Sequence, residues 1–311
     1  MATLLKTLAD VKKYVSVNAN TAFESIEPYI KQADRKYIKN LIGDTLYDAY
    51  ATTAPTGIPL KVYDLLCEAS ANLAQFLYLP LQQVQVSDTG ISVAQGESYK
   101  AAEWWQIRDL SRSFLEAGLQ ALDEALKIME ANEASFTGWS ATAGYTTFKE
   151  FFVKRTDTFN EWFNISNSRR TFLALRPCLR DAHHNYFTSQ LNEETIATIN
   201  LAVAPAHKKV LEFLQASQVN YAVAKMVDSG AFEITATGIF QKADEYPGYK
   251  TKTLEQFQLK ALKDERLSAG EEYFKKALAI IEANPTLFTA YEKKTDATFV
   301  APYNTKSTVS F

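Results

Sequence analysis

Apolar residues recur at three- and four-residue steps along most of the chain, a spacing typical of amphipathic helices. The clearest stripe lies between residues 98 and 131, and a second one lies between residues 251 and 283. The same spacing predicts shorter or equally long helices at 8–16, 22–52, 60–80, 157–165, 168–202 and 206–228. The chain is therefore expected to be mainly α-helical.

Two short segments, 84–94 and 232–241, break the helical pattern with alternating apolar residues. Each contains a Thr-Gly pair, and the glycines, Gly90 and Gly238, supply the positive φ that a tight turn needs. Each segment is predicted to form a small β-hairpin. A two-stranded hairpin is marginal by itself, so its edges need cover from helices, from the other hairpin or from a neighbouring molecule.

The order of elements repeats because the sequence repeats. Residues 128–139 and 280–291 are identical at six of twelve positions, and three earlier segments agree in the same order at spacings of 148–149 residues. Self-similarity at a long, fixed period is the mark of duplicated architecture. We predict a tandem duplication of one helical unit, each copy with long antiparallel helices and one small β-hairpin. The units are assigned to residues 1–147 and 148–297, followed by an extended C-terminal arm, 298–311.

Glycine occupies the same place inside the last long helix of each unit, at Gly118 and Gly270. Glycine within a helix costs about 1 kcal/mol relative to alanine. Its presence in both units indicates a close helix crossing at which a Cβ would collide. Independent drift of the two sequences is the alternative interpretation.

Composition and charge narrow the class of protein. The 311 residues carry a formal net charge of −3, which gives no global basic field for nucleic acid. Charged residues interrupt the first 17 positions, and no apolar run is long enough to cross a bilayer, so neither a signal peptide nor a membrane span is expected. The two cysteines, Cys67 and Cys178, are isolated, which favours a reduced, cytoplasmic environment.

Residue patterns that carry chemistry are absent from the sequence. The three histidines, His183, His184 and His207, have no metal-ligand spacing with one another or with the cysteines, and they are expected at the surface or at an interface. No glycine-rich phosphate loop, Glu-x-x-His pair or nucleophile elbow occurs. We therefore predict no catalytic residue, no metal and no cofactor, and a protein that is not an enzyme. An active site assembled from residues distant in sequence is the alternative.

One local basic cluster is a candidate binding surface. Helical spacing places Arg169, Arg176 and Arg180 near one face at the start of the second unit's long helix. They fit a patch that meets an acidic partner surface or a DNA backbone. A solvated face, balanced by acids such as Glu161 and Asp181, is the other interpretation.

The end of the chain is rich in β-branched and aromatic residues without a helical period. Phe299, Tyr303 and Phe311 are its large apolar residues, and we interpret them as an arm that lies on a partner. A frayed terminus is the alternative.

The opening of the first unit, residues 4–91, combines apolar spacings with a few fixed letters: Leu8, Val11-Lys12, Tyr14-Val15, Ile30, Ala33, Ile38, Ile42-Gly43, Leu46-Tyr47-Asp48, Ala69, Leu73-Ala74, Phe76-Leu77-Tyr78 and Val86–Ile91. This pattern resembles the helical head–tail connector (portal adaptor) proteins of tailed bacteriophages. It is most similar to a related, uncharacterised group from phages and prophages of Bacteroides-like bacteria.

The resemblance implies a virion structural protein that forms a homo-oligomeric ring in the neck, between portal and tail. It implies the portal protein and tail or neck proteins as partners, and passage of DNA through the ring without sequence-specific binding. Before assembly the protein would be in the host cytoplasm. No catalytic residues carry over, because the family has none. The chain departs from the family in its duplication and its longer final helices. Another tail-completion or minor capsid protein, and a cytosolic helical scaffold, are the alternatives.

Overall fold

The structure is a computed structural model of the chain, and it describes residues 3–17, 21–82, 85–87, 90–92, 102–229, 232–235, 238–241 and 256–293. The chain divides into two compact units, Met1–Thr147 and Phe148–Phe311. The division falls where the sequence repeat places it. Residues 298–311, the predicted arm, lie outside the described residues.

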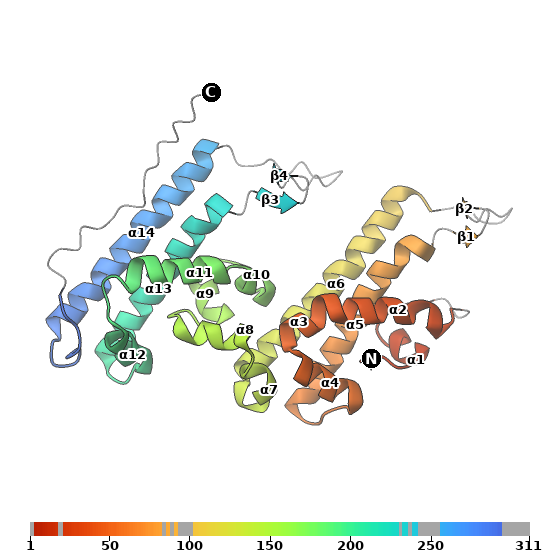
Figure 1. The fold of residues 1–311 in the computed structure, drawn as a ribbon, viewed down its shortest axis with the longest axis horizontal. Helices are drawn as coiled ribbons and strands as arrows, with labels where there is room; N and C mark the ends of the chain where they lie inside the picture. Colours follow the sequence, from red (N-terminus) through yellow and green to blue (C-terminus); the bar gives the residue numbers. More distant parts are fainter. Residues whose placement is uncertain are drawn as a thin grey trace. The chain divides into compact units, whose positions relative to one another are not determined.

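Unit 1 is built from short helices packed around one long helical pair (Figure 1). In chain order its elements are α1 (Leu8–Lys12), α2 (Phe23–Ala33), the π-helical turn η1 (Asp34–Ile38), α3 (Lys39–Ile42), α4 (Asp44–Thr52), α5 (Ile58–Gln82), β1 (Gln85–Ser87), β2 (Gly90–Ser92), α6 (Trp104–Ala131), the 3-10 turn η2 (Glu133–Ser135), α7 (Thr137–Ser140) and α8 (Ala143–Thr146).

Unit 2 repeats the main features of this order: a π-helical turn, a short helix, and two long helices with a strand pair between them. After the 3-10 turn η3 (Thr147–Glu150), its elements are α9 (Thr156–Trp162), α10 (Arg169–Ala174), α11 (Arg176–Ala182), the π-helical turn η4 (His183–Phe187), α12 (Glu193–Leu201), α13 (Pro205–Ser229), β3 (Phe232–Thr235), β4 (Gly238–Gln241) and α14 (Gln256–Ala283). The mainly helical, duplicated fold predicted from the sequence is therefore confirmed.

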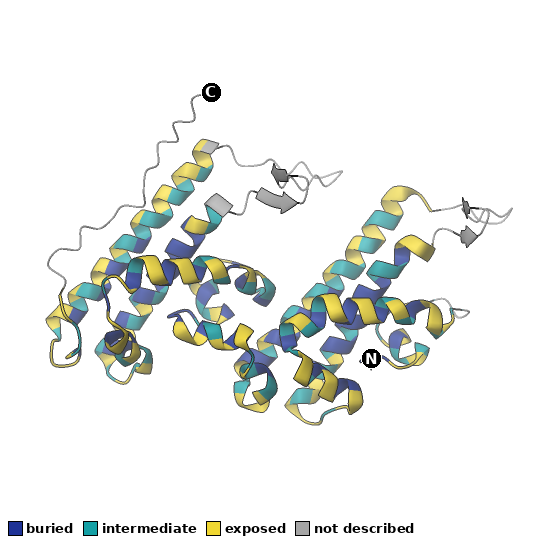
Figure 2. Ribbon diagram, viewed as in Figure 1, coloured by how far each residue is buried: buried dark blue, intermediate teal, exposed yellow. Residues whose placement is uncertain are grey.

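The long helices of each unit, α5 with α6 and α13 with α14, lie side by side and bury the faces they turn to each other (Figure 2). The repeated glycines sit at these contacts. A Cβ built on Gly118 would lie 2.8 Å from Leu73 Cγ, and one on Gly270 would lie 2.7 Å from Tyr221 Cε1. At Gly270 the approach is close enough for the Ser217 hydroxyl on α13 to donate a 2.8 Å hydrogen bond to the glycine carbonyl. The predicted close crossing is confirmed in both units.

Two short antiparallel strand pairs follow α5 and α13. In the first, Val86 pairs with Ile91, and in the second, Ile234 pairs with Ile239. Within the described residues each pair forms a separate two-stranded sheet.

The single long helices expected at 22–52 and 168–202 are wrong. Both stretches contain a π-helical turn, η1 and η4, at equivalent positions 149 residues apart. The first stretch then breaks at Gly43, whose φ of +84° turns the chain before α4 begins. The second is interrupted at Leu175, between α10 and α11, and again between η4 and α12. Residues expected on one helical face therefore lie on several short helices.

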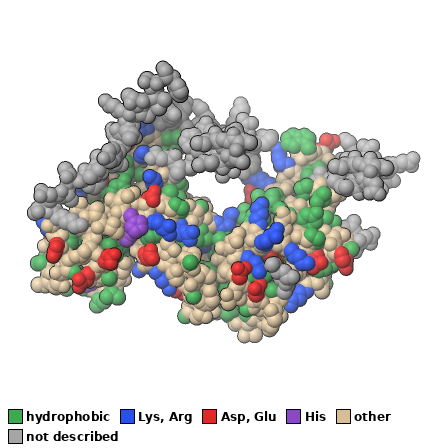
Figure 3. Space-filling model, viewed as in Figure 1, with side chains coloured by type: hydrophobic (Ala, Val, Ile, Leu, Met, Phe, Trp, Pro, Cys, Tyr) green, Lys and Arg blue, Asp and Glu red, His purple; other side chains and the backbone are tan. Residues whose placement is uncertain are grey.

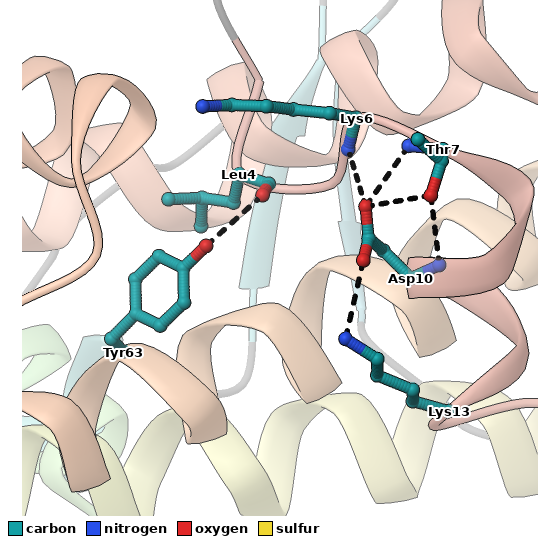
Figure 4. A network of polar contacts seen from close by, with 6 residues as sticks. All are labelled: Leu4, Lys6, Thr7, Asp10, Lys13 and Tyr63. Atoms are coloured by element: carbon teal, nitrogen blue, oxygen red, sulfur yellow. Dashed lines mark hydrogen bonds and ion pairs between the residues drawn. The ribbon is translucent and has the colours of Figure 1, made fainter.

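Unit 1 opens with an extended segment that is fixed to its core (Figure 4). The Tyr63 hydroxyl on α5 donates to the Leu4 carbonyl at 3.4 Å. At the start of α1, Thr7 and Asp10 form a capping box, in which the Asp10 carboxylate accepts from the backbone N–H groups of Lys6 and Thr7. These contacts hold the apolar residues of the segment in the core before the first helix begins.

Candidate partner-binding surfaces

Arg169 does not belong to an exposed basic face. It is the first residue of α10 and is only 1% exposed. Its guanidinium lies 5.0 Å from the ring centroids of both Phe148 and Phe172, an arrangement that stabilises a cation against aromatic faces. The expected grouping of Arg169 with Arg176 and Arg180 on one exposed face is wrong, because Arg169 is buried against these two rings.

Arg176 and Arg180 do lie together, one helical turn apart on α11. Arg176 is half-buried and Arg180 is exposed. His184, four residues after Arg180, is also exposed. Figure 3 shows Lys and Arg side chains gathered over α11, with a histidine beside them. Within the described residues Arg180 makes no ion pair. We call Arg176, Arg180 and His184 the basic stripe of unit 2.

Unit 1 carries basic residues at matching positions, a feature that the sequence reasoning missed. Lys31 corresponds to Arg180, and Arg35 corresponds to His184, each 149 residues earlier. Both are exposed; Lys31 pairs with Glu27 at 2.6 Å, whereas Arg35 makes no ion pair with a described residue. The repeat alignment contains this pair, and the exposure of both positions shows that they face solvent in each unit.

Exposed aromatic residues begin the last long helix of each unit. On α6, Trp104 is 63% and Trp105 is 49% exposed; on α14, Phe257 is 65% exposed. Trp105 and Phe257 occupy equivalent positions, 152 residues apart. Large aromatic side chains at a protein surface are common anchors of interfaces. We call Trp104, Trp105 and Phe257 the aromatic tips; the repeat alignment contained this signal too.

Phe299, Tyr303 and Phe311, the candidate residues of the arm, lie outside the described residues. Their assignment to partner binding remains a prediction.

A buried polar cluster lies at the first π-helical turn. Asp34 is 1% exposed, and its carboxylate accepts hydrogen bonds from the Tyr47 hydroxyl and, at 2.5 Å, from the Ser70 hydroxyl. Burial raises the pKa of the Asp34 carboxyl above its ordinary value, although the hydrogen bonds from Ser70, Tyr47 and the Leu4 backbone act in the opposite direction. These contacts join α4, α5 and the opening segment, and they account for the cluster as a structural one.

The position equivalent to Asp34 in unit 2 is His183, which is 7% exposed. Of the two places expected for the histidines, the surface or an interface, the surface is wrong for His183, because the rings of Phe151, Phe152 and Phe187 surround it. Burial, and the neighbouring His184, lower the pKa of His183 to about 4, so the ring is neutral at pH 7.

His207 is also buried, at 8% exposure, which again differs from the expected surface position. Its Nδ1 accepts from the Ala204 N–H at 3.3 Å at the start of α13, and its Nε2 lies 3.3 Å from the Leu287 carbonyl oxygen. The ring therefore connects the start of α13 to the turn after α14.

In the described part of the chain, no three His, Cys, Asp or Glu side chains gather as a metal ion would require. Among the helices the structure describes, none combines the length and apolar content needed to cross a membrane. Among the described surfaces, the basic stripe and the aromatic tips are of kinds that suit macromolecular contacts.

The fold defines a tandem helical-repeat protein whose two units share one architecture. Both units match the model of one protein family, the family of unknown function DUF6712, over residues 17–149 and 175–299. Because these matches cover most of the chain, the chain belongs to this family, and the double match agrees with the internal repeat. No curated protein and no solved structure matches the chain.

Proposed function

We propose that the chain is a structural protein of a tailed-phage particle, a head–tail connector that forms a ring between portal and tail. The resemblance of residues 4–91 to connector proteins carries the proposal. It includes the portal protein and tail or neck proteins as partners, DNA passing through the ring without sequence-specific contacts, and a location in the host cytoplasm before assembly.

The surfaces of the described residues support a protein that acts by binding. The aromatic tips stand at equivalent places in both units, so a partner with repeated sites can meet them twice per chain. Exposed aromatic rings lose water-accessible apolar area on docking, and such anchors contribute most of the binding energy in many interfaces. We assign contact with the portal protein to the aromatic tips.

The basic stripe of unit 2 supports the passage of DNA. Arg176 and Arg180 lie one helical turn apart, about 6 Å along the helix, which suits successive phosphates without reading bases. In unit 1, Lys31 and Arg35 match Arg180 and His184, whereas Glu27 matches Arg176 and pairs with Lys31, so we assign the DNA contact to unit 2.

The test is binding of the purified chain to assembled portal rings encoded by the same genome, measured by co-sedimentation. We expect Trp105→Ala together with Phe257→Ala to weaken binding by about tenfold or more, as loss of interface aromatics does. The matched control changes Leu201→Ala and Val203→Ala, which are 74% and 77% exposed but lie outside the aromatic tips. Failure of the unaltered chain to bind portal rings contradicts the connector function and favours another position in the particle.

A further inference from the structure

The two units open in the same way, 148 residues apart. Leu4 and Leu5 precede α1 in unit 1, and Phe152 and Val153 precede α9 in unit 2; all four side chains are at most 2% exposed. Both segments are tied to the core by a buried polar side chain. In unit 2 the Gln218 side-chain oxygen accepts from the N–H groups of Phe152 and Val153, each at 3.0 Å. In unit 1 Asp34 accepts from the Leu4 backbone.

Unit 2 places one further ring just before this segment. Phe148 is 1% exposed and stacks on Phe172 of α10, with centroids 4.6 Å apart and an interplanar angle of 25°. Phe172 is fully buried as a result. Phe148 therefore completes the aromatic core at this end of unit 2.

Unit 1 has a counterpart of Phe172, which we call the receiving ring, but no described aromatic ring stacks on it. Phe23, at the start of α2, corresponds to Phe172 of α10. It is half-buried rather than buried, and it makes no ring contact within the part of the chain that the structure describes. Among those residues, none of unit 1 takes the place that Phe148 takes in unit 2.

The sequence that supplies Phe148 occurs again after unit 2. Thr298-Phe299 repeats Thr147-Phe148, and an aromatic residue follows four positions later in both cases, Tyr303 and Phe152. The two matches to the family model end at residues 149 and 299, so each match ends at, or one residue after, the phenylalanine of this repeated pair. Phe23 therefore lacks such a ring among the described residues, and the sequence around Phe299 repeats the one that supplies Phe148 to unit 2.

We propose that Phe299 of one copy docks on Phe23 of a second copy, as Phe148 docks on Phe172 within one chain. Unit 2 does not accept Phe299 at its own receiving ring, because Phe148 already occupies it. A contact between the end of one copy and the start of the next is heterologous, and it closes into a ring when the rotation between copies permits. As the joint of a neck ring the contact rests on the proposed function, but the docking itself is tested on the purified protein alone.

The first test places the photo-reactive residue benzoylphenylalanine at position 299 of the full chain. Unlabelled reactive chains are mixed with ¹⁵N-labelled unaltered chains, illuminated and digested with trypsin. We expect cross-links to the labelled peptide 14–31, which contains Phe23. Cross-links that stay within one chain, or that map to other peptides, overturn the proposal.

The second test compares Phe299→Asp with Phe311→Asp by analytical ultracentrifugation. Both variants put the same charge into the final segment, but position 311 has no part in the proposed contact. We expect Phe299→Asp to raise the dissociation constant of self-association about tenfold to hundredfold, which is the effect of losing one buried phenylalanine. Phe311→Asp should leave it unchanged. The docking is contradicted if the unaltered protein is monomeric or if both variants have equal effects. If the protein self-associates as expected but does not bind portal rings, only the proposed function is contradicted.

Discussion

The crossing of α5 and α6 at Gly118 gives the sharpest prediction about the fold. In Gly118→Ala the new Cβ would lie 2.8 Å from Leu73 Cγ and 3.2 Å from Asn72 Cβ, whereas carbon atoms in contact normally stay about 3.5–4.0 Å apart. Leu73 is fully buried. Overpacking of this kind costs about 1–3 kcal/mol, and the better helix propensity of alanine returns about 1 kcal/mol. We expect a net destabilisation of about 0–2 kcal/mol.

Urea unfolding, followed by circular dichroism, measures this effect against a matched control. Gly138→Ala changes a helical glycine whose Cβ would meet nothing nearer than Leu46 Cβ at 4.0 Å, so it should stabilise by about 0.4–1 kcal/mol. In a Leu73→Ala background, which opens space at the crossing, Gly118→Ala should become stabilising as well. Equal stabilisation by Gly118→Ala and Gly138→Ala in the unaltered background would refute the close crossing.

Three further predictions concern the buried imidazole of His183, the buried carboxylate of Asp34 and the basic stripe of unit 2. Because the pKa of His183 falls from 6.5 in the unfolded chain to about 4 in the fold, stability is full above pH 6.5 and falls as the pH drops toward 4. Between pH 7.5 and 5 the loss should be on the order of 1–2 kcal/mol in urea unfolding, and His183→Phe should reduce it. Tyr47→Phe removes a donor to the buried Asp34 carboxylate and should cost about 1–3 kcal/mol in the same assay; an unchanged midpoint contradicts that role. Arg176→Glu with Arg180→Glu should weaken salt-dependent binding of double-stranded DNA in filter assays without changing the melting temperature, and unaltered binding would make the stripe an ordinary solvated face.

The sequence alone predicted the duplicated helical fold, the unit boundary and the contact made by Gly118 and Gly270. These features depend on periodicity and on local backbone cost, which a single sequence displays directly. The internal repeat also contained the aromatic tips and the basic residues of unit 1, but these were found only when exposure showed which repeated positions face solvent.

The errors have a common physical origin in tertiary structure. The apolar spacing predicted one continuous helix in each of the stretches 22–52 and 168–202, but the π-helical turns η1 and η4 and the interruptions at Gly43 and Leu175 divide them. Arg169 is a buried cation that lies 5.0 Å from the ring centroids of both Phe148 and Phe172, and no local sequence pattern predicts that a guanidinium will be buried. His183 continues the apolar stripe formed by Leu179 and Ala182, and this position in the stripe indicates burial. The sequence interpretation placed it at the surface or an interface because histidine is polar.

The central claim, a ring protein between portal and tail, is tested most directly by quantitative mass spectrometry of purified particles from the genome that encodes the chain. The account predicts that the chain is present at a fixed ratio to the portal protein, one-to-one or, because each chain carries two units, one-to-two. Complete absence from clean particles would contradict the account and favour a scaffold that works in the cytosol.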